Sequence, residues 1–248
     1  MTAPVWLVIP TFNEADGIDR LVRTAHAELR RATSRHRILI VDDASPDGTG
    51  DIADRLGAEM EEVEVLHRPG KAGLGQAYRA GFAVALSGGA EVIVQMDADF
   101  SHDPAYLPGM LRALDGADLV LGSRYVPGGG VTDWGPARRG LSRGGCLYAR
   151  LVLRVPVRDM TGGFKVIRRE VLETIDLSTV GSQGYGFQIE TTYRALRTGF
   201  RVREVPIVFS DRREGSSKMS AHIALEAMRL VPRLRRSRHR GSRTVSRG

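Results

Sequence analysis

The chain has 248 residues, of which 42% are hydrophobic and 26% are charged, and this composition excludes an intrinsically disordered protein. Cys146 is the only cysteine, which excludes a disulfide-stapled scaffold. No run of residues approaches the roughly 18 consecutive apolar positions that a membrane-spanning helix requires.

Short apolar runs and helical patterns alternate along the first half of the chain. Five runs rich in Val, Ile and Leu predict buried strands at 5–10, 38–42, 63–67, 92–96 and 119–122. Apolar residues from Ile18 to Leu29 recur at helical spacing, and 51–56, 76–86 and 105–114 are helical in pattern too. One more strand is predicted at 202–209. This alternation predicts an α/β fold with a mainly parallel sheet, whose ligands bind beyond the carboxyl ends of the strands.

Acidic residues gather where three of these strands end. Glu14 follows the first strand, Asp42 and Asp43 end the second, and Asp97 and Asp99 follow the fourth. Residues two apart in extended chain point the same way, so both carboxylates of the last pair can approach one cation. Oxygen ligands shared with substrate phosphates suit Mg²⁺ or Mn²⁺. The alternative, capping of the next helix, fits Asp103 better, because Asp103 precedes a proline.

The second strand end has two interpretations of equal weight. In the first, one acid of the pair Asp42 and Asp43 accepts hydrogen bonds from the loop amides. In the second, the other acid accepts a hydrogen bond from a base or a ribose. After the first strand there is no glycine until Gly17, so neither a dinucleotide-binding fingerprint nor a Walker loop is present. This argues against a dehydrogenase or a phosphate-loop NTPase.

Nine short motifs occur in order along almost the whole chain. They are Pro-Thr-Phe-Asn-Glu at 10–14, Val-Asp-Asp-x-Ser-x-Asp-Gly-Thr at 41–49, Arg-x-x-Lys-x-Gly-Leu-Gly at 68–75, Met-Asp-Ala-Asp-x-Ser-His at 96–102, Gly-Ser-Arg-Tyr at 122–125, Arg-Arg-x-x-Ser-Arg-Gly at 138–144, Asp-x-Thr-x-Gly-Phe at 159–164, Gly-Tyr-x-Phe-Gln-x-Glu at 184–190 and Asp-Arg-x-x-Gly-x-Ser-Lys at 211–218. Together they resemble the family-2 glycosyltransferases of the GT-A fold. The last motif resembles that of the polyprenol-phosphate (dolichol-phosphate) mannosyltransferases.

The resemblance implies transfer of mannose from GDP-mannose to a polyprenyl monophosphate with inversion, giving a β-mannosyl phosphate, with Mg²⁺ or Mn²⁺ as cofactor. It implies a nucleotide-sugar pocket of Pro10, Phe12, Glu14, Val41, Asp43, Asp97, Ala98, Asp99, Arg124, Arg212 and Lys218. Asp97, Asp99 and Ser101 would hold the metal, Ser101 directly or through water. Arg124, Arg138, Ser142 and Arg212 would bind the acceptor phosphate. The residues expected to act in catalysis are Asp97, Asp99, Arg124 and Arg212.

A phosphate acceptor is an anion near neutral pH, so the reaction needs cationic positioning rather than a general base. We therefore interpret Glu190 as a structural or arginine-pairing residue. His102 is interpreted as loop scaffold, and Gly162 and Gly163 as a tight turn that permits a close backbone approach.

The C-terminal end differs in charge from the rest of the chain. Residues 219–248 contain eight arginines and one acidic residue and carry the whole net charge of +7. We expect a GT-A domain over 1–218, followed over 219–248 by an amphipathic helix and an Arg-rich, disordered tail. The segments 141–155 and 223–234 mix apolar residues with arginines and are candidates for helices that lie on a membrane surface. The alternative is that both pack on the core.

The N-terminal residues lack the basic region of a secretory signal, so we expect a cytoplasmic protein, peripheral on the cytoplasmic face of the membrane. An integral membrane partner protein is compatible with this arrangement. Two other functions are weighed: a family-2 enzyme that uses UDP-glucose or UDP-GlcNAc, and a nucleic-acid-binding protein that uses the Arg tail. Because residues 1–218 are neutral overall, no nucleic-acid partner is expected.

Overall fold

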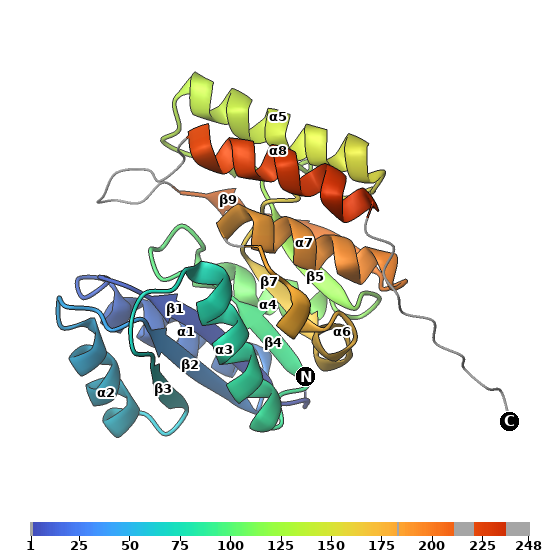
Figure 1. Ribbon diagram of the computed structural model, residues 1–248. Coiled ribbons are helices and arrows are strands. Elements are labelled where there is room, and N and C mark those ends of the chain that lie inside the picture. Colours follow the sequence, from blue (N-terminus) through green and yellow to red (C-terminus); the bar gives the residue numbers. More distant parts are fainter. Residues whose placement is uncertain (1, 183, 211–220, 237–248) are drawn as a thin grey trace, which may run out of the picture.

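The computed structural model describes residues 2–182, 184–210 and 221–236, with side chains from residue 228 onward in the last range. A seven-stranded sheet forms its centre, in the order β3-β2-β1-β4-β7-β5-β8 (Figure 1). Its strands are β1 (Val5–Thr11), β2 (His36–Asp42), β3 (Val63–His67), β4 (Val92–Gln95), β5 (Leu119–Ser123), β7 (Lys165–Arg168) and β8 (Val202–Pro206). A second, two-stranded sheet pairs β6 (Gly130–Val131) with β9 (Val208–Phe209).

The sheet is mainly parallel, as the alternating pattern predicts. Strands β1 to β4 pair in parallel, and so do β5 and β8. The helices are α1 (Ile18–Ala32), α2 (Thr49–Glu59), α3 (Leu74–Ser87), α4 (Leu107–Arg112), α5 (Pro136–Leu153), α6 (Arg169–Thr174), α7 (Gly184–Arg197) and α8 (Ala221–Arg236), with short 3₁₀ turns η1 (Pro104–Tyr106) and η2 (Leu177–Thr179). The five strands predicted in the first half of the chain are confirmed.

Two hydrophobic cores cover the two faces of the sheet. Along β1, Val5, Leu7 and Ile9 face the core formed with α1, α2 and α4. Trp6 and Val8 face the other core, formed with α3, α5, α6, α7 and α8. Burial on both faces explains why β1 is a continuous apolar run instead of an alternating one.

Strand β7 was not predicted, and it lies in the middle of the sheet. It pairs antiparallel with both β4 and β5. Its four residues begin with Lys165 and end with Arg168, so no apolar run marks it. The predicted strand 202–209 is divided at Ile207, and only its first part joins the large sheet.

Helix α8 lies beside α5 and α7 in Figure 1, and its Val231 and Leu234 are buried in the core under these helices. Tyr148 of α5 donates a hydrogen bond to the carbonyl of Met228 at 3.0 Å. Part of the predicted amphipathic helix therefore packs on the body of the protein. Residues 237–248, on which the prediction of a disordered tail falls, lie outside the described residues.

Candidate active site

The loops after β1 and β2 are bonded to each other at the carboxyl edge of the sheet. The backbone N–H of Glu14 donates to the hydroxyl of Thr49 at 2.9 Å, and that of Ala15 donates to the carboxylate of Asp47 at 3.1 Å. Asn13 has a left-handed backbone (φ 60°), and its N–H donates to the hydroxyl of Ser45 at 3.1 Å. The turn residues of the second motif thus hold the first motif in place.

The structure separates the roles of the two acids that end β2. The buried Asp42 accepts from the hydroxyls of Thr11 at 3.1 Å and Ser45 at 2.6 Å, so it is the residue that holds the loop. Asp43 is 5% exposed and forms an ion pair with Arg68. Arg68 opens the third motif, so Asp43 joins the second and third motifs at this edge.

The other predicted nucleotide-pocket residues in this region differ in how they are placed. The ammonium of Lys71 lies 3.8 Å from the centre of the Phe12 ring, a cation–π contact. Pro10 is buried within β1. The side chain of Val41 is fully buried in the core under α3, and its backbone lies in the sheet between β1 and β3.

The loop after β4 contains the candidate metal ligands. One oxygen of Asp97 accepts from the hydroxyl of Tyr78 at 2.7 Å, while the Asp97 side chain remains 27% exposed. Asp99 accepts from the backbone N–H of Ser101 at 3.1 Å. Burial, then the charges of Asp97 and Asp99, raise the pKa of the Tyr78 hydroxyl well above its ordinary value. Tyr78 therefore stays protonated and donates to Asp97.

The donor set of this loop fits a hard divalent cation. Asp97 and Asp99 supply two carboxylates, and Mg²⁺ is typically bound by one or two carboxylates together with substrate phosphates. The hydroxyl oxygen of Ser101 is buried and has no hydrogen-bond partner among the described residues. A buried polar atom of this kind normally has a partner, and an ion or its water would satisfy it.

The turn that precedes β7 closes over the acidic loop. A Cβ atom at Gly163 would lie 3.4 Å from a carboxylate oxygen of Asp97 and 3.3 Å from the ring of His102. A Cβ at Gly162 would lie 3.1 Å from the carbonyl oxygen of Gly122. These distances confirm the predicted close backbone approach, and a side chain at either position would require its neighbours to shift by a few tenths of an ångström.

His102 and Asp103 have the structural roles predicted from the sequence. The backbone N–H of Asp97 donates to Nδ1 of His102 at 3.1 Å, and the buried ring stacks on Phe164 at a centroid distance of 5.0 Å. Burial lowers the pKa of His102, although Asp97 and Asp99 act in the opposite direction. Asp103 accepts from the backbone N–H of Ala105 and so caps η1.

Arg124 makes several hydrogen bonds to other residues of the protein, which the sequence did not predict. Its Nε and Nη2 donate to the two carboxylate oxygens of Asp159 at 2.8 and 2.6 Å, and Nη2 also donates to Thr161 at 2.7 Å. The Arg124 side chain is 4% exposed and that of Asp159 is fully buried. Burial alone would lower the pKa of Arg124, but Asp159 outweighs it and the pKa is raised. This ion pair joins the fifth motif to the seventh.

Aromatic rings lie beside two of the three predicted phosphate-binding arginines, Arg124 and Arg138. The guanidinium of Arg138 lies 4.1 Å from the centre of the Trp134 ring. That of Arg124 lies 5.7 Å from the same ring and 5.4 Å from Phe209. Trp134 therefore brings Arg124 and Arg138 together, and the sequence analysis had missed it because no motif contains it.

Ser142 lies near this group but is already hydrogen-bonded. The hydroxyl of Tyr125 donates to the hydroxyl of Ser142 at 2.6 Å. Arg212 and Lys218, the remaining predicted site residues, lie outside the described residues. For these two positions the roles implied by the motif stay predictions.

Two buried charged residues flank the site. Glu190 forms an ion pair with Arg194 at 2.5 Å and accepts from the hydroxyl of Ser182, which agrees with its interpretation as an arginine-pairing residue. Lys165 is fully buried and donates to the carbonyl of Gln188 and the hydroxyl of Thr191, each at 3.0 Å. Burial lowers the pKa of Lys165 to about 7, only partly opposed by Asp159.

The sequence matches the glycosyl transferase family 2 profile over residues 6–176. The chain is a family-2 glycosyltransferase. This glycosyltransferase is 50% identical over 224 residues to a polyprenol monophosphomannose synthase of Mycolicibacterium smegmatis, which covers 90% of this chain and 83% of that protein. It is 47% identical to an undecaprenyl-phosphate mannosyltransferase of Micrococcus luteus, over 92% of this chain and 93% of that protein.

Solved structures show the same GT-A fold. A glucosyl-3-phosphoglycerate synthase from Mycobacterium tuberculosis, in complex with Mn²⁺, UDP and phosphoglyceric acid, superposes with a TM-score of 0.70 at 17% identity, covering 94% of this chain and 78% of that one. A mannosyltransferase from Pyrobaculum calidifontis, in complex with GDP-Man and Mn²⁺, gives 0.60 at 17% identity, covering 92% and 61%. Within the described ranges of this glycosyltransferase, no helix has the length and apolarity needed to cross a bilayer.

Proposed function

We propose that this glycosyltransferase transfers mannose from GDP-mannose to a polyprenyl monophosphate with inversion, giving a polyprenyl β-mannosyl phosphate. The observation that carries the proposal is the 50% and 47% identity, over nine tenths of the chain, to two enzymes named for mannosyl transfer to polyprenol carriers. Two features of the geometry support it: the acids Asp43, Asp97 and Asp99 at the carboxyl edge of the sheet, and the arginines Arg124 and Arg138 beside Trp134.

The loops after β1 and β2 would bind the nucleoside of the donor. Phe12 offers an aromatic ring, which also contacts the ammonium of Lys71. Asp43 offers a carboxylate that Arg68 orients. Glu14 is half-buried in the loop that Thr49 and Asp47 hold, so its carboxylate lies on the same edge. A base and a ribose need stacking surface and hydrogen-bond acceptors, and these residues provide both.

Asp97 and Asp99 would hold a divalent metal, with Ser101 contributing directly or through a water. When bound, such an ion neutralises charge on the diphosphate leaving group. The protein's own part is to orient the ligands. Tyr78 donates to one oxygen of Asp97, leaving the other oxygen toward the turn at Gly163. The backbone of Ser101 likewise orients Asp99.

The acceptor phosphate would bind near Arg138, Trp134 and Arg124. A phosphate monoester is already anionic near neutral pH, so no residue must remove a proton from it before attack. This agrees with the environment of Glu190, whose carboxylate is bonded to Arg194 and Ser182. Nε and Nη2 of Arg124 are hydrogen-bonded to Asp159. We therefore assign Arg124 two roles: its charge contributes to the positive potential of the site, and its bonds to Asp159 position the residues around it.

A polyprenyl acceptor lies in a membrane, and the outer face of α5 suits contact with one. Leu141, Leu147 and Leu151 of α5 are 49%, 53% and 65% exposed, and Met228 of α8 beside them is 50% exposed. The exposed Arg139 and Arg143 belong to the same helix. Apolar side chains next to basic ones favour peripheral binding to an anionic bilayer.

Transfer is tested with purified protein, radiolabelled GDP-mannose, a polyprenyl phosphate and Mg²⁺ or Mn²⁺, followed by lipid extraction. We expect label in the lipid phase, and loss of that label with a chelator or in Asp99→Asn. Label from UDP-glucose or UDP-GlcNAc in place of GDP-mannose would keep the family assignment and refute the mannosyl proposal. Failure with every donor would refute transfer to this acceptor.

Membrane contact is tested by co-sedimentation with vesicles that contain anionic phospholipid. The double variant Leu147→Ser/Leu151→Ser and the variant Arg143→Gln should bind more weakly than the wild type. Arg55→Gln is a matched control, because Arg55 is an exposed arginine of α2, on the opposite side of the sheet. Equal loss in Arg143→Gln and Arg55→Gln would contradict a specific role for α5.

A further inference from the structure

A cluster of two histidines and one glutamate lies at the edge of the sheet opposite the candidate active site. His36 is the first residue of β2, and Glu62 directly precedes β3, so both lie at the amino ends of their strands. His26 lies on α1. The six steps from His36 to Asp42 span about 20 Å of strand, which separates the cluster from the nucleotide edge. No motif of the family resemblance includes these three residues.

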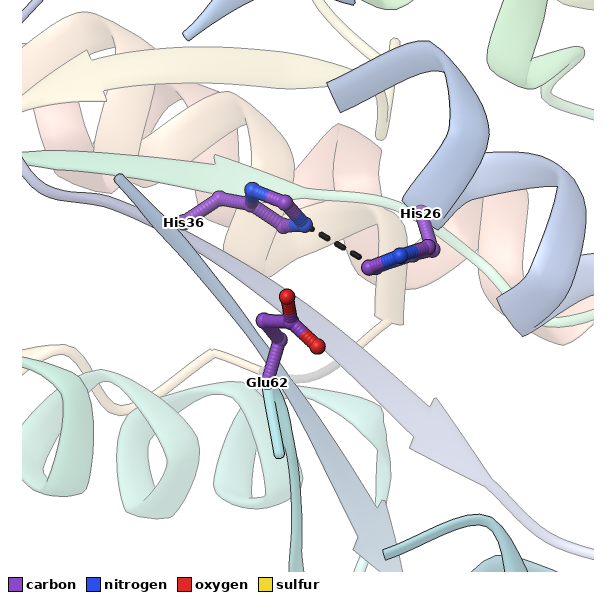
Figure 2. A group of neighbouring side chains, drawn as sticks. All are labelled: His26, His36 and Glu62. Carbon is purple, nitrogen blue, oxygen red and sulfur yellow. Dashed lines mark hydrogen bonds between the residues drawn. The ribbon is translucent and has the colours of Figure 1, made fainter. Parts of the chain in front are cut away.

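The three side chains converge on one point from α1, β2 and the turn before β3. Figure 2 shows the rings of His26 and His36 facing each other, with the carboxylate of Glu62 directed toward them. Nε2 of His36 lies 3.0 Å from Nδ1 of His26. One ligand atom from each of the three residues lies within 4.8 Å of the others. Within the part of the chain that the structure describes, no other group of three or more His, Cys, Asp or Glu residues meets this condition.

The separation of the two ring nitrogens is close to that at a bound zinc ion. Zn–N bonds of about 2.0–2.1 Å in a tetrahedron place two nitrogens about 3.3 Å apart, so the rings need to separate by only a few tenths of an ångström. Two imidazoles and one carboxylate are a ligand set that Zn²⁺ accepts while keeping a fourth position open. The two oxygen ligands at Asp97 and Asp99, by contrast, suit a harder ion.

The surroundings of the cluster give the access that a metal needs. All three residues are half-buried, so packing restrains their side chains while they still reach solvent. His36 and Glu62 also line a surface cavity of about 1170 Å³, through which an ion and its remaining ligand can enter.

We propose that His26, His36 and Glu62 bind one Zn²⁺ ion, whose fourth position opens to this cavity. Coordination replaces the hydrogen bond between the two rings. The histidine that donates this bond changes tautomer: its ligating nitrogen loses the proton to solvent, and its other ring nitrogen takes one up. Both imidazoles stay neutral, and Glu62 contributes one negative charge against that of the ion. The ion joins α1, the start of β2 and the turn before β3, so its binding stabilises the fold at the edge remote from catalysis.

The experiment is equilibrium dialysis of the full chain with Zn²⁺ in an excess of Mg²⁺, which occupies oxygen sites without competing for imidazole. We expect one Zn²⁺ per chain, retained in Asp99→Asn. His26→Gln and Glu62→Gln should each weaken binding at least about 100-fold, the upper end of what loss of a residue supporting a ligand costs. His67→Gln is the matched control, since His67 pairs with a single carboxylate, that of Asp54.

Two further measurements do not depend on activity. Co²⁺ in place of Zn²⁺ should give the intense visible absorption of a four-coordinate site in the wild type and lose it in His26→Gln. Zn²⁺ should raise the midpoint of thermal unfolding of the wild type and of His67→Gln, but not that of Glu62→Gln. Circular dichroism of the metal-free variants checks that they are folded.

Zinc binding that persists in His26→Gln and Glu62→Gln would overturn the proposal, as would binding that disappears in Asp99→Asn or equally in His67→Gln. A wild-type chain that binds no Zn²⁺ under these conditions would overturn it as well.

Discussion

Replacement of Asp159 by Asn removes one charge from the most buried ion pair near the site. Asp159 is fully buried and accepts from the backbone N–H, Nε and Nη2 of Arg124. Burial alone would raise the pKa of Asp159, but Arg124 outweighs it and the pKa is lowered. The substitution leaves a guanidinium that is 4% exposed without its counter-charge. Loss of one partner of such a pair costs about 3–5 kcal/mol in the free energy of unfolding.

Urea denaturation at pH 7 measures this loss. The matched control is Asp118→Asn, because Asp118 also binds both ends of an arginine fork, but the Arg201 side chain is 66% exposed. Solvent screens that pair, so its loss should change stability far less. Since the pKa of Asp159 is lower in the folded state, its charge stabilises the fold above pH ~4 and ceases to do so as the pH falls through the folded value. The difference between wild type and Asp159→Asn should therefore narrow below pH 4.

Transfer activity gives a second measurement on the same variant. If Arg124 positions the acceptor site through Asp159, folded Asp159→Asn should lose activity on the order of 100-fold, the cost of a misplacement of about 1 Å. Arg124→Lys keeps the charge but not the fork, and should lose activity similarly. Destabilisation no greater than that of Asp118→Asn, together with unchanged activity, would refute the reasoning.

Three further predictions concern single buried groups. The pKa of Lys165 is about 7 in the folded state against 10.5 ordinarily, a difference equivalent to about 5 kcal/mol. This cost is fully present below pH 7 and shrinks as the pH rises towards 10.5. Lys165→Met should therefore be more stable than wild type at pH 7 and lose most of this advantage by pH 10, as measured by urea denaturation. Ser101→Ala should not lower the midpoint of thermal unfolding, because the hydroxyl has no partner among the described residues. It should raise the metal concentration needed for half-maximal transfer roughly 10-fold. An unchanged metal requirement would contradict a role for Ser101. In Gly81→Ala, the new Cβ would lie 2.4 Å from Val8 and 2.9 Å from Val41. We therefore expect the free energy of unfolding, measured by urea denaturation, to fall by about 1–3 kcal/mol. An unchanged free energy would show that α3 can shift away from the sheet.

The sequence by itself determined the class of fold and the chemistry of one edge of the sheet. Apolar runs marked β1 to β5, because strands buried on both faces contain few polar residues. The order of strands and helices then placed Asp43, Asp97 and Asp99 at one edge, since the carboxyl ends of parallel strands meet there. The ordered motifs indicated the family, which the profile match over residues 6–176 confirmed.

Tertiary structure decided which of these residues stabilise the loops of the site and which are available to a ligand. Asp42 and Asp43 are neighbours in sequence, and only the positions of Thr11 and Arg68 show which one holds the loop. The Arg124–Asp159 pair spans 35 residues, and no local pattern connects its two partners.

The unpredicted strand and the histidine cluster have the same explanation. Strand β7 is defined by its pairing with β4 and β5, because its four residues carry no periodic signal. The cluster of His26, His36 and Glu62 exists because α1 returns the chain to the start of β2 beside the turn into β3. Local periodicity is written in the sequence, whereas contacts between distant segments form only when the sheet brings those segments together.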